Sequence, residues 1–243
     1  MMSDPGSALR DARAAIAIGK GMPGNETRIA IATGQWLEGE ALIRLNRAKE
    51  ARKVITGALT VAVQHQPASK LHADLLKASA AIANETGDLQ LALTSLHQAH
   101  RIFGKLGERR SQAIVYQNIG SLYSEARDYQ RVLYYYDLAN ETYGEDPSLA
   151  LAAHNNRGNA FKEMGRLAEA PREFRTALAI AHKIESPLLE ARIITNIAST
   201  QYLNGDLSAA ETTAISGLSL AAGDAAEWRP FLWGIRAQIA YAL

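Results

Sequence analysis

The chain of 243 residues contains no cysteine. This excludes disulfide bonds and metal sites built on thiolates, and it leaves the cytoplasm and the periplasm both open as locations. Net charge is almost absent as well, because 26 basic residues face 25 acidic ones and leave a formal charge of +1. We therefore expect neither nucleic acid nor a membrane surface as a partner, since both attract proteins through an excess of positive charge.

Long hydrophobic runs are also missing. No stretch approaches the roughly 20 apolar residues that a membrane-spanning helix needs, and the start "MMSDPGSALRDARAA" lacks the apolar core and cleavage site of a signal peptide. With 47% hydrophobic residues the chain should nevertheless fold into a soluble domain or repeat array. The expected location is the cytoplasm, or the periplasm if a native signal once preceded the doubled methionine.

Catalytic motifs are the third absence. The sequence has no nucleophile elbow, no H-E-x-x-H helix and no paired carboxylates in a credible context. The stretch "GKGMPG" (19–24) matches G-x-G-x-x-G, but it follows a helical segment instead of a strand, so it is interpreted as a helix stop and linker. His97 and His100 share a helix face but have no third ligand nearby. We predict no enzyme, no metal and no cofactor within these residues; any enzymatic output domain would lie outside the chain.

What the sequence does contain is a repeat. Five segments align with one another, and they start 41, 40, 38 and 40 residues apart: 39–59, 80–100, 120–140, 158–178 and 198–218. A fixed period of this length is the signature of an architecture that stacks one structural unit many times.

Small side chains recur at three positions of the repeat. The first position is occupied by Gly39, Ala80, Gly120, Gly158 and Ala198; the second, twelve residues on, by Ala51, Ala92, Val132, Ala170 and Ala210; the third by Ala58, Ala99, Ala139, Ala177 and Gly217. Small residues at fixed places in two successive helices allow the helix backbones to approach closely.

A turn is expected between the first two of these positions. It is marked by residues that, with one exception, readily adopt the left-handed conformation that ends a helix: Asn46, Gly87, Arg127, Gly165 and Gly205. Large apolar residues fill the helices on either side, at Leu42, Tyr123, Phe161, Ile55, Leu96, Tyr136 and Phe174. Each repeat is therefore predicted to be a hairpin of two helices.

The segment "GNAFKEMGRLAEAPREFRTAL" (158–178) most clearly resembles a tetratricopeptide repeat (TPR), and the resemblance extends over roughly residues 24–243. It implies an all-α fold, a right-handed α-solenoid of antiparallel helical hairpins. The period of about 40 residues exceeds the usual 34 and resembles the repeat arrays of bacterial signalling and regulatory proteins. Arg157 and Arg127 depart from the family pattern, which has an apolar residue and a glycine at these places.

The expected organisation is a single array over residues 1–243. A capping helix at 7–20 precedes five repeats and a partial sixth, with approximate bounds 24–66, 67–107, 110–145, 148–185, 187–222 and 226–243. The last segment has the pattern of a first helix without a second, so we expect that Leu243 is not the natural end of the protein. In the first repeat Trp36 and Leu37 make the groove face apolar, and the capping helix is expected to cover them unless they bind an apolar ligand.

The candidate binding site is a polar groove along the first helices of the hairpins. Two residues before the first small position, three successive repeats carry asparagine, at Asn118, Asn156 and Asn196. Helical spacing adds neighbours to this row: Lys77, Gln117, Asn155, Asn159, Lys162, Arg192 and Tyr202. A side-chain amide both donates and accepts hydrogen bonds, so a row of amides can bind the backbone of an extended peptide.

The alternative is that these asparagines are solvated, or bond to the next helix and set the pitch of the array. His154 and Arg157 fall on neighbouring faces and are expected to contact adjacent helices. The predicted function is a peptide-binding or protein-binding interaction or sensory module within a larger bacterial regulator, such as a diguanylate cyclase, a histidine kinase or a transcription factor. The alternative function is a structural scaffold that assembles complexes or associates with itself through its C-terminal helix.

Overall fold

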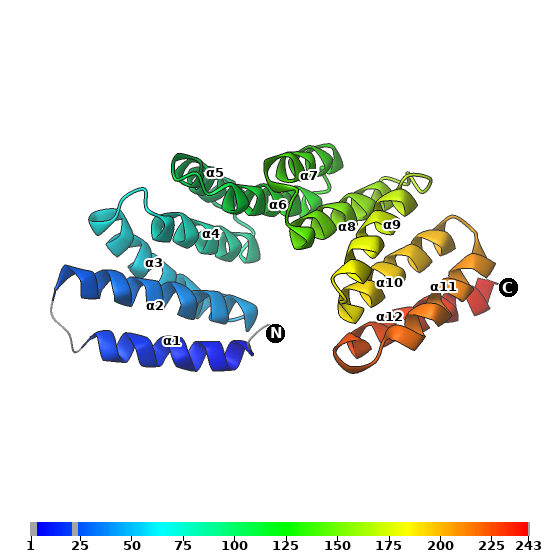
Figure 1. Cartoon of the computed structure of the whole chain (residues 1–243), viewed down its shortest axis with the longest axis horizontal. Helices are drawn as coiled ribbons and strands as arrows, with labels where there is room; N and C mark the ends of the chain where they lie inside the picture. Colours follow the sequence, from blue (N-terminus) through cyan, green and yellow to red (C-terminus); the bar gives the residue numbers. More distant parts are fainter. Residues whose placement is uncertain (1–3, 21–23, 243) are drawn as a thin grey trace. The chain divides into compact units, whose positions relative to one another are not determined.

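The computed structural model describes residues 4–20 and 24–242, and all regular structure in this part of the chain is helical. Its elements are, in chain order, α1 (Pro5–Gly19), α2 (Asn25–Arg44), α3 (Ala48–His65), α4 (Lys70–Glu85), α5 (Leu89–Lys105), α6 (Arg109–Glu125), α7 (Tyr129–Tyr143), α8 (Pro147–Glu163), α9 (Ala170–Lys183), α10 (Pro187–Leu203), α11 (Leu207–Leu220), the short 3-10 helix η1 (Gly223–Trp228) and α12 (Arg229–Ala242) (Figure 1).

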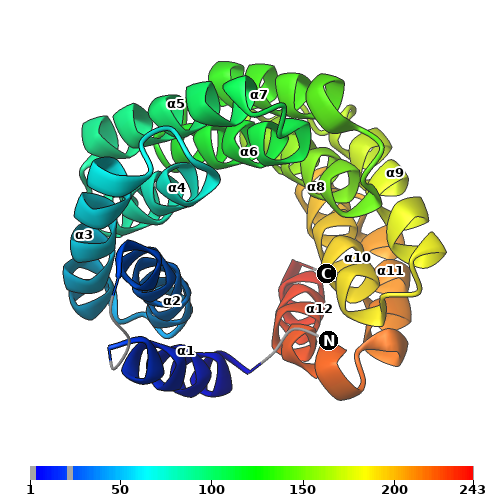
Figure 2. The ribbon, with the colours of Figure 1, turned by 60° about the vertical axis from the view of Figure 1, so that its left-hand side comes forward.

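These helices form two compact units, one up to Leu122 and one from Tyr123 onward. In the first unit, α1 packs against α2, α2 against α3, α3 against α4 and α4 against α5. In the second unit, each α-helix from α7 to α11 likewise packs against the next α-helix in the chain (Figure 2). The repeated hairpin of two helices confirms the predicted fold class, an all-helical solenoid of antiparallel hairpins; a single array over the whole chain stays a prediction.

The small residues lie where the two helices of a hairpin meet. Ala51 and Ala170 are fully buried, as the predicted packing requires. A Cβ atom on Gly39 would lie only 2.3 Å from Cδ1 of Ile55, and one on Gly158 only 2.6 Å from Cε1 of Phe174. The first helix therefore needs glycine here because a large side chain of the second helix occupies the space.

The turns between the helices adopt the predicted left-handed conformation at all five positions. The φ angles are 56° at Asn46, 76° at Gly87, 57° at Arg127, 71° at Gly165 and 84° at Gly205. The residue after each of these donates its N–H to a carbonyl five residues earlier; at Arg127 the bond runs from the N–H of Asp128 to the oxygen of Tyr123, at 2.9 Å. This is the hydrogen-bond pattern of a Schellman helix end, and it forms even where the residue is not glycine.

Replacing Arg127 with glycine is expected to stabilise the protein. The left-handed conformation costs a residue with a Cβ atom about 1 kcal/mol, and glycine would remove this cost. Part of the resulting stabilisation is lost because glycine gives the unfolded chain more conformational freedom. We expect Arg127→Gly to raise the free energy of unfolding by about 0.5 kcal/mol, measured by urea denaturation. The control is Arg175→Gly on the exposed side of α9, which should lower it by about 1 kcal/mol; two changes of the same sign would contradict the assignment.

The prolines and the glycine-rich stretch agree with the helix assignment. Pro171 and Pro230 lie in the first turns of α9 and α12, where their missing N–H groups cost no hydrogen bond. The "GKGMPG" stretch begins where α1 ends, at Gly19, and α2 begins directly after Gly24. Residues 21–23 of that stretch lie outside the described residues. A helix precedes the glycines, so the strand that a dinucleotide-binding motif needs is replaced by a helix.

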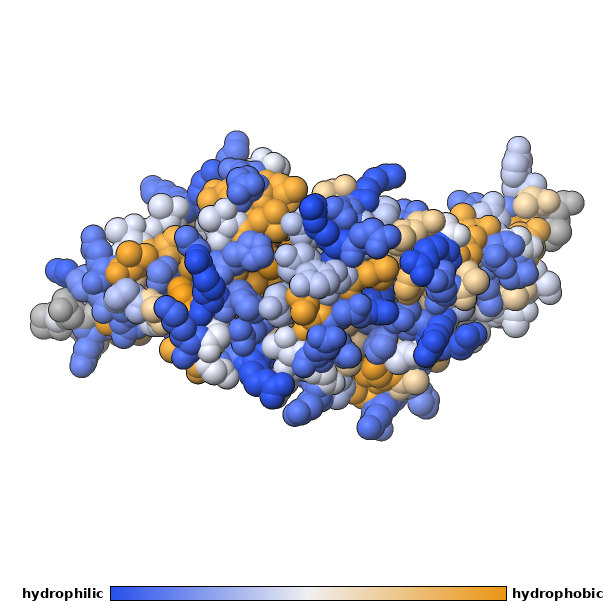
Figure 3. Space-filling model, turned by 90° about the horizontal axis from the view of Figure 1, so that it is seen from above, coloured by the Kyte–Doolittle hydropathy of each residue, from blue (hydrophilic) through white to orange (hydrophobic). Residues whose placement is uncertain are grey.

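The surface mixes polar and apolar side chains. In Figure 3 hydrophilic residues cover most of the face in view, with separate apolar patches between them. Of the helices in the described part of the chain, none combines the length and the apolar character that crossing a membrane requires.

Candidate functional site

The ten candidate residues all lie on first helices of hairpins, and they divide between the two units. In the first unit Lys77 belongs to α4, and Gln117 and Asn118 belong to α6. In the second unit α8 carries Asn155, Asn156, Asn159 and Lys162, and α10 carries Arg192, Asn196 and Tyr202.

In the first unit a small cavity brings two of the predicted residues together. It has a volume of about 170 Å³, and Lys77 from α4 and Asn118 from α6 both line it. Asn84 and Ser121 add further polar groups, while the remaining lining is apolar and includes Leu96. Gln117, the neighbour of Asn118 in the sequence, does not line this cavity. The cavity thus combines an ammonium group and a side-chain amide above an apolar wall.

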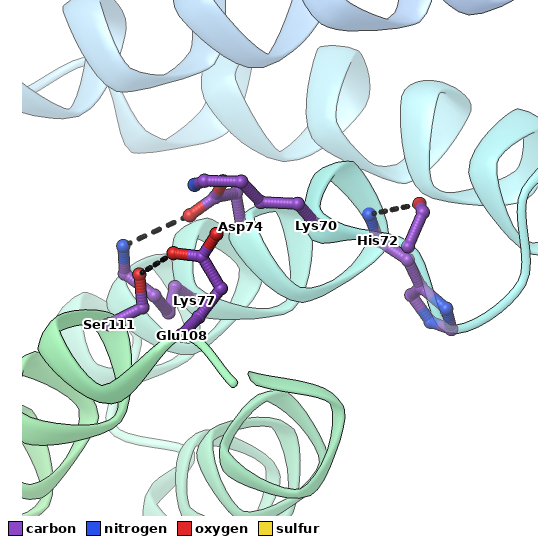
Figure 4. A network of polar contacts seen from close by, with 7 residues as sticks. Lys70, His72, Asp74, Lys77, Glu108 and Ser111 are labelled. Atoms are coloured by element: carbon purple, nitrogen blue, oxygen red, sulfur yellow. Dashed lines mark hydrogen bonds and ion pairs between the residues drawn. The ribbon is translucent and has the colours of Figure 1, made fainter. Parts of the chain in front are cut away.

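Lys77 is held in place by a buried carboxylate that sequence reasoning missed. Asp74 is only 4% exposed; its Oδ2 lies 2.7 Å from Nζ of Lys70 and its Oδ1 lies 3.3 Å from Nζ of Lys77. Both ammonium groups also lie over the ring of Phe103, at 5.7 and 5.9 Å from its centroid. We call Lys70, Asp74 and Lys77 the Asp74 cluster (Figure 4). The available signal was the spacing, because lysines four residues before and three residues after an aspartate reach it on one helix.

Lys70 and Lys77 compensate the charge of Asp74 from two sides. Figure 4 also draws Glu108 and Ser111 at the start of α6, where the hydroxyl of Ser111 donates to Oε2 of Glu108 at 3.4 Å. A carboxylate that is nearly inaccessible to water is costly unless it is paired on more than one side. Asp74 meets this condition through two lysines, and as a consequence the Lys77 ammonium is oriented at the cavity instead of moving freely in solvent.

In the second unit the asparagines bond to one another. Nδ2 of Asn196 donates to Oδ1 of Asn155 at 2.9 Å, Nδ2 of Asn155 donates to Oδ1 of Asn156 at 3.2 Å, and Nδ2 of Asn156 donates to the hydroxyl of Tyr136 at 2.9 Å. These four residues, which we call the Asn network, connect α10, α8 and α7. Tyr136 was assigned only to the core, where it is indeed almost fully buried; a buried tyrosine hydroxyl needs a partner, and that need was the missed signal.

The Asn network has two consequences. Its bonds join helices of successive hairpins, as the structural alternative for the asparagines requires. They also fix the orientation of the half-buried amides of Asn156 and Asn196. A side-chain amide has two donor hydrogens and two acceptor lone pairs, so one or two hydrogen bonds use only part of its capacity. The two roles considered for the asparagines are therefore compatible in this geometry.

The other candidates of the second unit are half-buried. Burial lowers the pKa of the Lys162 ammonium. Burial also lowers the pKa of the Arg192 guanidinium, although the charge of Glu227 acts in the opposite direction. Tyr202 packs against an apolar cluster that includes Ala198 and Leu232, so part of its ring serves the core. These residues lie on the same helices, α8 and α10, as the asparagines of the Asn network, but in the described part of the chain they do not form hydrogen bonds with it.

His154 and Arg157 contact adjacent helices, as predicted. Nδ1 of His154 lies 2.8 Å from Oε2 of Glu173 on α9, and Nε of Arg157 lies 3.3 Å from the same oxygen. Arg157 also pairs with Asp137 on α7. Burial alone would raise the pKa of Glu173, but the hydrogen bond from His154 and the charge and hydrogen bond of Arg157 outweigh it and lower that pKa. The arginine at an ordinarily apolar repeat position thus joins α7, α8 and α9.

The apolar start of the groove face is covered only in part. α1 packs against α2, yet a cavity of about 510 Å³ between them is lined by Trp36 and Leu37 together with Ala8 and Ala12 of α1. Leu37 remains 47% exposed. Among the described residues, no three histidine, aspartate or glutamate side chains are grouped so that they could hold a metal ion.

Comparison with solved structures identifies the type of repeat. BtubC (BKLC) from P. vanneervenii is 16% identical, with 90% of this chain and 91% of that chain covered and a TM-score of 0.74. The STAND protein with a tetratricopeptide repeat sensor, PH0952 from Pyrococcus horikoshii, is 14% identical over 88% of this chain and 34% of that chain, with a TM-score of 0.73. A Rap protein complexed with Competence and Sporulation Factor is 15% identical over 88% and 66%, with a TM-score of 0.65. At these identities the likeness shows the fold.

Sequence comparison adds the family. No curated protein matches the chain. The family model of the soluble NSF attachment protein, SNAP, matches residues 44–226, three quarters of the chain, from the end of α2 into η1. The small residues at the helix contacts and the left-handed turns of the hairpins are features of a tetratricopeptide-repeat protein. From the match of the family model, the chain belongs to the SNAP family.

Proposed function

We propose that this protein is an interaction module that binds an extended peptide segment of a partner along the first helices of its hairpins. The observation that carries the proposal is the cavity of about 170 Å³ at which Lys77 and Asn118 meet. Pockets for drug-sized ligands usually measure about 300 to 1,000 Å³, so this one is small for such a ligand and suits one residue of a peptide. Its ammonium and amide groups complement a peptide backbone, which offers both carbonyl acceptors and N–H donors.

The oriented amides of the second unit support the same proposal. Asn156 and Asn196 are held by the Asn network, so a bound peptide would lose less free energy in ordering them than in ordering freely rotating side chains. A Rap protein with a similar fold was solved in complex with Competence and Sporulation Factor, and PH0952 carries its repeats as a sensor. By analogy, we place the peptide-binding module within a larger bacterial regulator.

Substituting Asn118 tests the proposal in the first unit. A peptide is first selected from a library of unstructured sequences, and its dissociation constant for the full chain is then measured by calorimetry. We expect Asn118→Ala to weaken binding about fivefold, the loss of one hydrogen bond worth about 1 kcal/mol. Gln64→Ala removes an amide from the exposed surface of α3 in the same unit and should leave the affinity unchanged. Equal affinity of the Asn118 variant and the parent would refute the peptide site.

A structural scaffold is the second candidate function. Its support is the exposed aromatic surface of α12, where Phe231, Trp233 and Tyr241 are 59%, 51% and 95% exposed. Apolar surface of this kind often marks a site of association. Light scattering over a range of protein concentrations separates the two functions: a mass that doubles with concentration favours self-association through this helix, and a constant monomeric mass contradicts it.

A further inference from the structure

A second recess of the first unit lies between α4 and α5, away from the proposed peptide site. We call it the α4–α5 pocket; it has a volume of about 340 Å³ and is lined by His72, Leu76, Gln98, Arg101, Ile102 and Lys105. None of the predicted site residues lines it. Figure 4 shows that the His72 ring points away from the Asp74 cluster on the same helix. The pocket therefore uses a different face of α4 from the one that carries Lys77.

The walls of this pocket are positively charged. Arg101 and Lys105 lie four residues apart on α5 and are both exposed, so their side chains share one face of the helix. α5 contains no aspartate or glutamate. On α4, Asp74 is occupied by its two lysines, and Glu85 lies at the opposite end of the helix from His72. Among the described residues no carboxylate pairs with either Arg101 or Lys105.

The nearest carboxylate along the chain, Glu108, does not line the pocket, and its Oε2 accepts a hydrogen bond from Ser111. Of the residues that line the pocket, Arg101 and Lys105 carry a positive charge and none carries a negative one. The positive potential at the pocket is therefore local, and the net charge of +1 for the whole chain conceals it.

The remaining lining supplies a neutral donor and an apolar floor. The N–H of Ala68 donates to Nδ1 of His72 at 3.2 Å, so in the neutral ring the proton lies on Nε2, at the other side of the imidazole. Burial lowers the pKa of His72, which favours this neutral form. Leu76, 5% exposed, and the half-buried Ile102 form the floor. A ligand here would meet hydrogen-bond donors and cations at the rim and aliphatic carbon below.

We propose that the α4–α5 pocket docks an acidic segment of a partner protein, with an aliphatic side chain of that segment on Leu76 and Ile102 and flanking carboxylates on Arg101 and Lys105. Charge complementarity selects an acidic occupant, since two cations without partners favour carboxylates. The apolar floor selects a protein segment over a free anion, because a carboxylate alone would leave Leu76 and Ile102 uncovered. This site is independent of the peptide site at Lys77 and Asn118.

The test uses the full chain and a labelled synthetic peptide in which one leucine is flanked on each side by two glutamates. Binding is followed by fluorescence anisotropy at low ionic strength. We expect the double variant Arg101→Gln, Lys105→Gln to bind about tenfold more weakly, because it removes both cations of the pocket and each exposed charge pair contributes only modestly. The matched control is Lys49→Gln, Lys53→Gln, which removes the same charge at the same spacing from the exposed side of α3 and should keep the parental affinity.

Changes to the peptide separate the contributions. Replacing its glutamates with glutamines should remove the salt dependence and most of the affinity, and replacing its leucine with glycine should weaken binding while preserving the salt dependence. Asn118→Ala should bind this peptide as the parent does, so failure of the peptide-groove proposal would not affect the result. The proposal would be overturned if the pocket variant (Arg101→Gln, Lys105→Gln) and the control variant (Lys49→Gln, Lys53→Gln) lost peptide affinity equally. It would also be overturned if the protein did not bind the peptide but bound vesicles of anionic lipid in a way that depends on Arg101 and Lys105.

Discussion

Replacing Gly158 with alanine is expected to lower the free energy of unfolding by about 2 kcal/mol, a typical cost of overpacking a core. The new Cβ atom would lie 2.6 Å from Cε1 and 2.7 Å from Cδ1 of Phe174, well inside van der Waals contact. Phe174 is completely buried, in a cluster with Leu151 and Ile193, so its ring has little space into which it could move. Urea denaturation followed by circular dichroism measures the change.

Gly234→Ala provides the matched control. Gly234 lies within α12 of the same unit, is exposed, and has no atom within 4 Å of an added Cβ. There the substitution should stabilise the protein by about 0.5 to 1 kcal/mol, because alanine loses less conformational entropy than glycine in a helix. A stabilising effect at Gly158 as well would show that the helix contact is looser than the structure indicates. In a double-mutant cycle, Phe174→Leu should relieve part of the Gly158→Ala penalty.

The packing and turn positions could be predicted because each recurs in five repeats. A single arginine at a turn gives no signal for a left-handed residue, yet Arg127 stands in register with Asn46, Gly87, Gly165 and Gly205 and adopts the same conformation, with φ of 57°. The same comparison placed Gly158 against the second helix. Recurrence compensates for a departure in one repeat, because the backbone geometry is set by packing that all repeats share.

The polar contacts could not be predicted in the same way. The sequence predicted three asparagines at equivalent positions, Asn118, Asn156 and Asn196. In the structure Asn196 bonds to Asn155, one residue before its counterpart on α8. Such a pairing depends on how far one helix is shifted along its axis relative to the next. A shift by one residue is only about 1.5 Å, and the residue pattern does not specify so small a displacement. Asp74 was missed because an aspartate on a predicted helix is ordinarily exposed. Its burial follows from the packing around α4, not from local sequence.

Asn155→Ala should be the more destabilising of two matched asparagine substitutions on α8. The Asn155 side chain is buried, with 5% exposure, and it bonds on both sides, accepting from Asn196 and donating to Asn156. Its removal leaves one donor and one acceptor of the neighbours without these partners, at a cost of about 1 to 3 kcal/mol per unsatisfied buried group. Asn196 and Asn156 are only half-buried, so water can replace part of the loss, and alanine is the better helix former. We expect a net destabilisation of about 2 kcal/mol.

Asn159→Ala is the control, because Asn159 is half-buried on the same helix and lies outside the Asn network. That variant should change stability by less than about 0.5 kcal/mol. In a double-mutant cycle, the effects of Asn155→Ala and Asn196→Ala on the free energy of unfolding should be clearly non-additive. Either substitution alone already breaks the hydrogen bond between the two side chains, so the second cannot break it again. Additive losses would mean that the two amides do not act together. The same substitution also bears on binding. If Asn155 orients the amides of Asn156 and Asn196, Asn155→Ala should lower the affinity for a peptide that binds those amides, although Asn155 itself does not touch the peptide. The affinity should fall under conditions in which the variant is still folded.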